Sequence, residues 1–141
     1  MIIVDANVCI YAVNESMAQH VGAHKWMEKA LNGREPIGFA WVVLLAFLRI
    51  STLVALSPQP LGVRDAWNII DEWLGAPAAT VVAPTTRHSS VLRGLLTEIG
   101  VGGNLVNDAH LASLAIEYGA QIASFDRDFN RFGGVRSFVP G

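Results

Sequence analysis

The sequence predicts an α/β fold, a three-layer α/β/α sandwich built around a mostly parallel sheet, from three observations. Short apolar runs alternate with longer helical patterns along the whole chain. The connections between them are short, as is typical of strand–helix–strand units. The first run, Ile2-Ile3-Val4, is apolar throughout, which indicates a central parallel strand covered by helices on both faces.

The elements follow one another in a regular order. Strands are expected at five runs: 2–4, 37–39, 80–82, 121–125 and 135–139, the last at an edge of the sheet. Helical patterns lie between them: a stretch after residue 5, then 20–31, 41–50, 63–74, 86–99 and a final helix that opens near residue 107. The helix at 41–50 is expected to be almost wholly buried, and Trp67 and Trp73 to face inward. Residues 57–60 and 100–103 are expected to form loops, because they are rich in proline and glycine.

Length and composition indicate one domain spanning residues 1–141. The chain has 141 residues, of which 52% are hydrophobic, and this suits a well-formed core. A net charge of −2 excludes a protein that coats nucleic acid through a global basic field, but it allows an enzyme with a local basic rim. Cys9 is the single cysteine, so no intrachain disulfide can form, and we expect it to be buried. We expect a cytoplasmic protein with no membrane segment, because the N-terminus lacks a basic leader and the apolar run at 37–48 is too short to span a bilayer.

Asp108 stands where the last predicted helix begins. Asn104 or Asn107 is placed to cap this helix, and Gly119 is placed to end it. Counting from Asp108 by three and four residues gives a stripe of small side chains suited to packing on a sheet. A carboxylate at the head of such a stripe is costly to bury unless a cation or hydrogen-bond donors compensate it. The alternative is a solvated first-turn aspartate that interacts only with the helix dipole.

Two further carboxylates follow predicted strands. Asp5 ends the first strand, Asp126 follows the fourth, and Asp108 opens the helix that leads into that fourth strand. Parallel sheets bind ligands at the carboxyl ends of their strands, so these side chains are expected to converge. Clustered carboxylates repel one another unless they share a cation, and Mg²⁺ or Mn²⁺ prefers oxygen ligands. The residues therefore indicate a metal-dependent phosphoryl-transfer site, most simply that of a nuclease.

Three segments resemble the acidic motifs of PIN-domain ribonucleases: Val-Asp-Ala-Asn at 4–7, Asn-Asp-Ala-His-Leu-Ala at 107–112 and Ser-Phe-Asp-Arg-Asp-Phe at 124–129. Together with segment 41–49, they make the chain most similar to the VapC toxins of bacterial type II toxin–antitoxin systems, from end to end. The resemblance implies a PIN-like fold and a Mg²⁺-dependent endoribonuclease toxin. It also implies metal-assisted hydrolysis of a structured RNA such as a tRNA, a small cognate antitoxin as partner, and a homodimer.

The resemblance assigns the metal-binding residues one by one. Asp5, Asp108 and Asp126 are the expected catalytic residues and the expected ligands of Mg²⁺ or Mn²⁺. Asp128 is a further candidate ligand, although a solvated aspartate in a turn explains it equally well.

The candidate RNA-binding residues are Asn7, Arg49 and Arg127, with Arg131 as a further possibility. Asn7 is placed to hydrogen-bond Asp5 or the scissile phosphate, or to form a local turn. The arginines could hold the RNA backbone, and surface ion pairs are the alternative explanation for each.

The chain departs from the PIN pattern at Ala46. PIN domains usually carry a glutamate there, and they retain the arginine three residues later, as Arg49 does here. The alternative function is therefore a degenerate, non-cleaving PIN domain that binds RNA or an antitoxin. Glu15 is a candidate stand-in for the missing carboxylate. A receiver-like phosphotransferase using Asp5 is a third hypothesis, weakened because Asn7 occupies the place of the second aspartate that an Asp-x-Asp phosphatase needs.

Three histidines, His20, His24 and His110, are expected to have structural roles rather than to bind a metal. His20 and His24 have the i, i+4 spacing of a zinc pair, but no third ligand is evident and the intervening glutamate of the HExxH motif is missing. His110 lies two residues from Asp108 on a different helix face and is expected to be structural.

Overall fold

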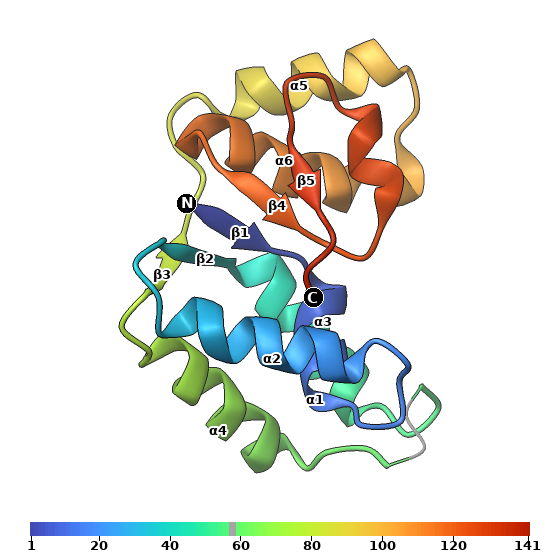
Figure 1. Ribbon diagram of the computed structural model, residues 1–141. Helices are drawn as coiled ribbons and strands as arrows, with labels where there is room; N and C mark the ends of the chain where they lie inside the picture. Colours follow the sequence, from blue (N-terminus) through green and yellow to red (C-terminus); the bar gives the residue numbers. More distant parts are fainter. Residues whose placement is uncertain (57–58) are drawn as a thin grey trace.

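A parallel sheet forms the centre of the molecule in the computed structural model, which describes residues 1–56 and 59–141 (Figure 1). Within these residues the sheet has five strands in the order β3-β2-β1-β4-β5, and each neighbouring pair is parallel. The predicted α/β fold with a mostly parallel sheet is thereby confirmed. The strands are β1 (Ile2–Val4), β2 (Ile37–Ala40), β3 (Ala79–Val82), β4 (Gln121–Ala123) and β5 (Ser137–Phe138).

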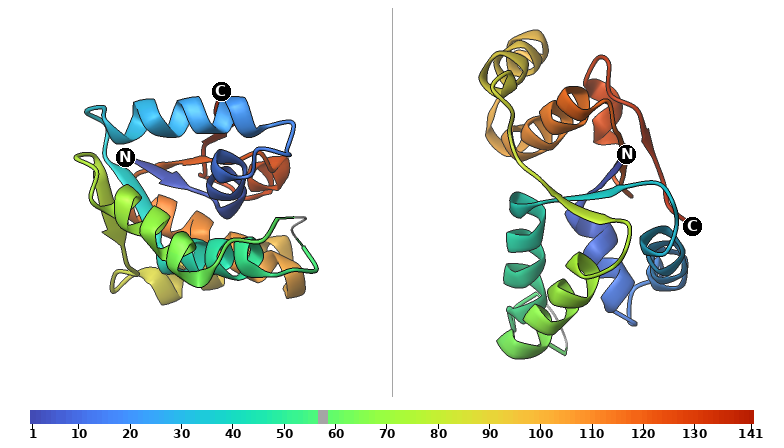
Figure 2. Two further views of the ribbon diagram at one scale, coloured as in Figure 1. Left: turned by 90° about the horizontal axis from the view of Figure 1, so that it is seen from below. Right: turned by 90° about the vertical axis from the view of Figure 1, so that its left-hand side faces the viewer.

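Helices connect the strands and flank the sheet (Figure 2). Among the described residues, two α-helices lie between each of the first three pairs of consecutive strands, with the 3-10 helix η1 directly before the second helix of the third pair. Another 3-10 helix, η2, lies between the last pair. The helices are α1 (Ala6–Val13), α2 (His20–Leu31), α3 (Trp41–Thr52), α4 (Val63–Leu74), α5 (His88–Ile99), the 3-10 helix η1 (Gly103–Leu105), α6 (Val106–Tyr118) and η2 (Arg127–Arg131).

The strand order reverses between β1 and β4, and this reversal places the candidate site. The chain moves from β1 outward to β2 and β3, then returns past β1 to β4 and β5. In an open parallel sheet, such a switch point leaves a crevice at the carboxyl ends of the strands. Val4 is in register with Ala123, and the Asp5 backbone nitrogen donates to the Ala123 carbonyl oxygen at 3.0 Å. Asp5 and Ser124 therefore leave the sheet side by side.

The N-terminal cap of α6 differs from the prediction. Leu105 occupies the capping position, and no side chain caps the helix there. The 3-10 turn of η1 runs directly into α6, and Leu105 already has right-handed helical torsion angles, so neither Asn104 nor Asn107 acts as the cap. The other end follows the prediction, since Gly119 closes the helix at a φ of 61°.

Several predicted strands and helices are longer than the observed ones. The strand predicted at 121–125 ends at Ala123, and the edge strand predicted at 135–139 is limited to Ser137–Phe138. The helix predicted from residue 86 begins at His88, after a turn. Residues 57 and 58 of the predicted loop at 57–60 lie outside the described residues.

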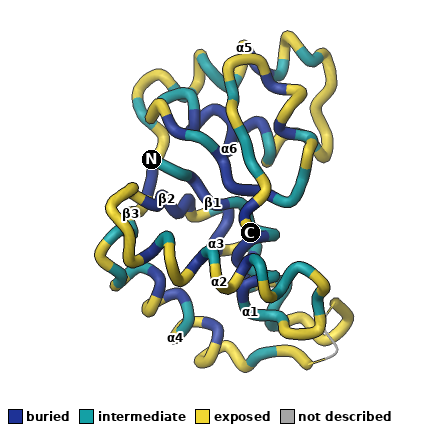
Figure 3. Tube along the Cα trace, in the orientation of Figure 1, coloured by how far each residue is buried: buried dark blue, intermediate teal, exposed yellow. Residues whose placement is uncertain are grey.

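Burial matches the prediction in β1, where Ile3 and Val4 are fully buried, but not on two helices (Figure 3). Cys9 is fully buried as expected, and burial raises the pKa of its thiol. Trp41 and Leu45 on α3 are 45% and 57% exposed, and Trp67 on α4 is 39% exposed, although all three were expected to be buried. The faces of α3 and α4 that carry Phe47 and Trp73 pack into the core instead, which turns these three side chains outward.

The long apolar run at 37–48 divides between β2 and α3. None of the helices in the described part of the chain has the length and apolar character needed to cross a membrane.

Candidate metal centre

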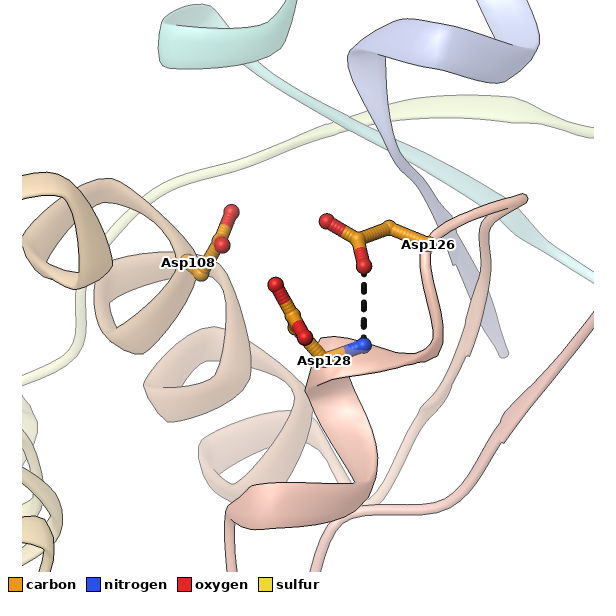
Figure 4. A group of neighbouring side chains, drawn as sticks. All are labelled: Asp108, Asp126 and Asp128. Carbon is orange, nitrogen blue, oxygen red and sulfur yellow. Dashed lines mark hydrogen bonds between the residues drawn. The ribbon is translucent and has the colours of Figure 1, made fainter.

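Three carboxylates converge at the carboxyl edge of the sheet (Figure 4). Asp108 comes from the first turn of α6, Asp126 from the loop after β4, and Asp128 from the start of η2. One ligand oxygen from each side chain lies within 4.8 Å of the other two. A set of three carboxylate oxygens at this spacing fits a hard divalent cation such as Mg²⁺ or Mn²⁺.

A local turn fixes two of these carboxylates. Asp126 caps η2, and its Oδ1 accepts a hydrogen bond from the Asp128 backbone nitrogen at 2.8 Å. Asp128 also pairs with Arg131, at 3.7 Å between the Oδ1 and Nη2 atoms. The two explanations offered for Asp128 are therefore compatible, because it belongs to a turn and also faces the other carboxylates.

Asp5 lies beside this cluster, outside the 4.8 Å group. Its Oδ1 accepts a hydrogen bond from the Ala6 backbone nitrogen at 2.8 Å, so Asp5 caps α1. Its Oδ2 accepts hydrogen bonds from the Ser124 hydroxyl at 2.7 Å and from Asn7 Nδ2 at 3.1 Å. Of the alternatives left open for Asn7, the structure shows the hydrogen bond to Asp5.

Ser124 is the residue that links Asp5 to the other carboxylates, and sequence reasoning gave it no role. It is 1% exposed. Its hydroxyl donates to Asp5 and accepts from Asn7 Nδ2 at 3.2 Å and from the Asp126 backbone nitrogen at 2.9 Å. The available signal was its position as the first polar residue after the apolar strand β4.

Burial and neighbouring negative charges raise the pKa values of Asp108 and Asp5. Burial raises the pKa of Asp108 to about 6, and the negative charges of Asp5, Asp126 and Asp128 contribute in the same direction. Burial also raises the pKa of Asp5, while hydrogen bonds from Ser124 and Ala6 act against this rise. Without a cation, the site therefore favours a protonated Asp108 at slightly acid pH. A divalent cation would reverse that preference.

Replacing Ser124 with alanine is expected to weaken both the site and the fold. The Asp126 backbone nitrogen and Asn7 would lose their shared acceptor, and Asp5 would lose a donor, so unfolding free energy should fall by about 1–3 kcal/mol. Loss of a group that orients metal ligands typically costs about 10- to 100-fold in metal affinity or activity. Urea denaturation and metal titration would measure the two effects.

Ser113→Ala is the matched control for that substitution. Ser113 is also a buried serine, but its hydroxyl donates to the Ala109 carbonyl within α6 at 2.8 Å. If Ser113→Ala lowered metal affinity as much as Ser124→Ala, the linking role of Ser124 would be wrong.

The structure places the predicted arginines on the surface. Arg49 is exposed in the last turn of α3, and Arg127 is exposed between the two aspartates of the η2 turn. Arg131 pairs with Asp128. Binding of RNA by Arg49 and Arg127 stays a prediction.

The remaining candidates do not belong to the carboxylate cluster. The rings of His20 and His24 stack at 5.4 Å between centroids, and His24 pairs with Glu28 at 3.6 Å. No group of three possible metal ligands within the described residues includes either histidine, and none includes Glu15.

A second polar network, which sequence reasoning missed, joins α5 to α6. His88 contacts Glu117 through Nδ1 at 2.5 Å and His110 through Nε2 at 2.9 Å. Glu117 also accepts hydrogen bonds from the backbone nitrogen and the hydroxyl of Thr85, at 2.9 and 2.6 Å. Burial alone would raise the pKa of Glu117, but these hydrogen bonds outweigh it and lower the pKa. His110 thus has the structural surroundings expected from the sequence.

Replacing Glu117 with alanine is expected to lower the unfolding free energy at pH 7 by about 3 kcal/mol, because Thr85 and His88 would lose a buried, charged acceptor. Since the pKa of Glu117 is lowered by folding, its contribution is present above the unfolded-state pKa and declines as the pH falls through the folded-state pKa. The difference between wild type and Glu117→Ala should therefore shrink in acid. Urea denaturation at several pH values would measure it, with the exposed Glu98 on α5 as the control position.

Comparisons with known proteins agree with this geometry. The sequence matches the PIN domain family over residues 2–135. It is 52% identical over 136 residues to Ribonuclease VapC37 of Mycobacterium tuberculosis, a match that covers 96% of this chain and 94% of that protein. Ribonuclease VapC33 of the same species is 38% identical over 136 residues, with 96% and 95% coverage.

Solved structures share the fold at lower identity. VapBC2 from Rickettsia felis, bound to a promoter DNA fragment, superposes with a TM-score of 0.73 at 20% identity and covers 100% of both chains. VapC20 of M. tuberculosis, described as a sarcin-ricin loop cleaving toxin, gives a TM-score of 0.68 at 19% identity, with 96% of this chain and 99% of that chain covered. The receiver-like phosphotransferase hypothesis is therefore wrong. The chain belongs to the PIN-domain family and, within it, to the VapC ribonucleases.

Proposed function

We propose that this chain is a Mg²⁺-dependent endoribonuclease toxin that cuts a structured RNA such as a tRNA and is neutralised by a small cognate antitoxin. The observation that carries the proposal is the convergence of Asp108, Asp126 and Asp128 at the switch point of the sheet, with Asp5 beside them. Mn²⁺ is expected to replace Mg²⁺, since both take oxygen ligands.

Each residue of the site has a separate proposed role in phosphodiester hydrolysis. Asp5, Asp108, Asp126 and Asp128 are the proposed ligands of the cation, with Asp5 beside the cluster that the other three form. A bound divalent cation would supply charge stabilisation at the phosphoryl oxygens and a more acidic water. Ser124 and Asn7 hold the Asp5 carboxylate in one orientation. Arg49 and Arg127 would contact the RNA backbone rather than the bases.

The partner proposals rest on the relatives and on exposed apolar side chains. The solved relatives include complexes of a VapC with its VapB. Trp41 on α3 and Trp67 on α4 are both partly exposed, with ring centroids 6.4 Å apart. A paired aromatic patch of this kind supports the proposed homodimer, because monomers rarely leave such side chains in water.

Ala46 supports a second candidate function, a PIN domain that binds RNA or the antitoxin without cutting. The residue lies within α3 and offers a methyl group where PIN domains usually carry a carboxylate. The three carboxylates of the cluster come from other elements, so they are assembled without position 46. This favours the active enzyme over the non-cleaving alternative.

The deciding experiment is cleavage of a total tRNA pool and of ribosomal RNA by the purified protein with Mg²⁺ or Mn²⁺, beside the Ala46→Glu variant. Cleavage by the wild-type chain that EDTA abolishes is the expected result, and the RNA that is cut distinguishes a tRNA from a ribosomal substrate. Cleavage by Ala46→Glu alone would instead support the non-cleaving alternative.

A further inference from the structure

We propose that a pocket between α1 and α3 binds one unpaired nucleobase of the RNA, next to the phosphodiester that is cleaved. The inference rests on the proposed ribonuclease function and adds a specificity site to it. The pocket, here named the α1–α3 pocket, has a volume of about 900 Å³. Its wall includes Asn7, Ile10, Tyr11, Phe47, Ile50 and Ser51.

The α1–α3 pocket begins at the candidate metal centre. Asn7 lines it and also belongs to the site, since its Nδ2 donates to Asp5 and its Oδ1 accepts from the Phe125 backbone nitrogen at 3.1 Å. Asp5 caps α1, so the helix that forms one wall starts at this carboxylate. A phosphodiester held at the carboxylates has a nucleoside on each side. The base of each nucleoside is separated from the phosphate by a single ribose. The pocket lies where that base would be placed.

The lining suits a neutral, flat group with polar edges. Tyr11 supplies an aromatic ring, and Ile10 and Ile50 supply aliphatic surface, while Phe47 forms the buried floor behind them. Asn7 and Ser51 add polar atoms, and a mostly apolar wall with a few polar groups is typical of pockets that bind small molecules. Unpaired bases are recognised by stacking on aromatic rings and by hydrogen bonds to their edges.

Charge favours a base over a charged occupant. Glu15 is the only charged side chain among the lining residues that the structure describes. These described lining residues therefore offer no cation to a phosphate or to an acidic peptide. The phosphate would instead lie with the cation at the carboxylates, and the uncharged base would enter the α1–α3 pocket.

Two adjacent residues of α3 provide a matched pair of variants. The hydroxyls of Ser51 and Thr52 each donate to the carbonyl four residues earlier, both at 2.6 Å, and both side chains are half-buried. Ser51 lines the pocket and Thr52 does not. Ser51→Phe should fill the pocket, while Thr52→Phe adds the same ring outside it. Ile50→Phe is a second filling variant in case Ser51→Phe fails to fold.

The test is an NMR titration of the full chain, in Mg²⁺, with the four nucleoside 5′-monophosphates and with ribose 5-phosphate as the base-free control. At least one nucleotide should bind about tenfold more tightly than ribose 5-phosphate, which corresponds to one stacked base. Thr52→Phe should keep this preference, and the filling variants should lose it.

Two results would overturn the proposal. The first is equal binding of nucleotides and ribose 5-phosphate by the wild-type chain. The second is a preference that survives both filling variants while binding of the antitoxin is lost, which would assign the pocket to the protein partner. Cleavage is not needed for this readout. If the protein prefers nucleotides over ribose 5-phosphate but cuts no RNA, the proposed base-binding pocket is supported. Only the proposed ribonuclease function is then contradicted.

Discussion

Replacing Asp108 with alanine is expected to lower the rate of RNA cleavage by about a thousandfold. Asp108 carries one of the carboxylates that would hold the cation, and charge stabilisation by such a cation is worth several kcal/mol in the transition state. Each 1.4 kcal/mol or so corresponds to a factor of ten in rate. Single-turnover cleavage of the identified RNA at saturating Mg²⁺ would measure the loss.

Asp65→Ala is the control for this result. Asp65 also occupies the first turn of a helix, α4, but it is exposed and lies outside the carboxylate cluster. It should therefore cleave at the wild-type rate. A rate for Asp108→Ala within tenfold of the wild type would contradict the assigned role.

Unfolding does not explain the expected loss. Burial and the neighbouring carboxylates raise the pKa of Asp108 to about 6, so its negative charge is unfavourable in the metal-free folded protein at neutral pH. Removing the charge should leave the metal-free protein at least as stable as the wild type. A variant that loses activity but keeps its stability is expected when the replaced charged group binds a ligand and does not stabilise the fold.

The sequence was sufficient to predict that Asp108 and Asp126 meet at the carboxyl edge of the sheet, with Asp5 beside them. Asp5 and Asp126 follow apolar runs that are too uniform for surface strands, and parallel strands end at a common edge. Asp108 could be placed near them because its helix precedes β4 and must run back across the sheet. These inferences need only the alternation of elements and the geometry of parallel sheets.

Other features depend on tertiary contacts that a linear pattern does not contain. Ser124 acquires its role only because Asp5 and Asn7, more than 100 residues earlier, lie beside it. Trp41 and Trp67 have the apolar character of core residues, but the core is already filled by Phe47 and Trp73. The hydrophobicity of a residue cannot show which of two apolar faces a helix will bury.

Mn²⁺ or Mg²⁺ is expected to stabilise the wild-type protein strongly at neutral pH. A ligand that binds only the folded state at about 100 times its Kd adds about 2.7 kcal/mol of stability. For a chain of 141 residues this corresponds to a rise in Tm of roughly 5–10 °C. Thermal unfolding followed by circular dichroism, with Mn²⁺ and with EDTA, would measure the shift without depending on any RNA substrate.

The stability of the folded protein should depend on pH with opposite signs in the presence and absence of the cation. Folding raises the pKa of Asp108 from 3.8 to about 6, so the metal-free folded protein binds more protons than the unfolded chain between those values. Its stability should therefore fall as the pH rises from about 4 through about 6. Protons compete with the cation for the same carboxylates, so the rise in Tm caused by Mn²⁺ should be small at pH 5 and large above pH 6.5 or so.

The Asp108→Asn variant distinguishes cation binding at Asp108 from a general effect of salt on stability. The variant keeps the size of the side chain but lacks the titrating group, so its metal-free form should be more stable than the wild type at pH 7. It should also lose most of the Mn²⁺-dependent rise in Tm, whereas Asp65→Asn should keep it. An equal rise in both variants would mean that the cation acts elsewhere, and the carboxylate cluster would then not be the metal site.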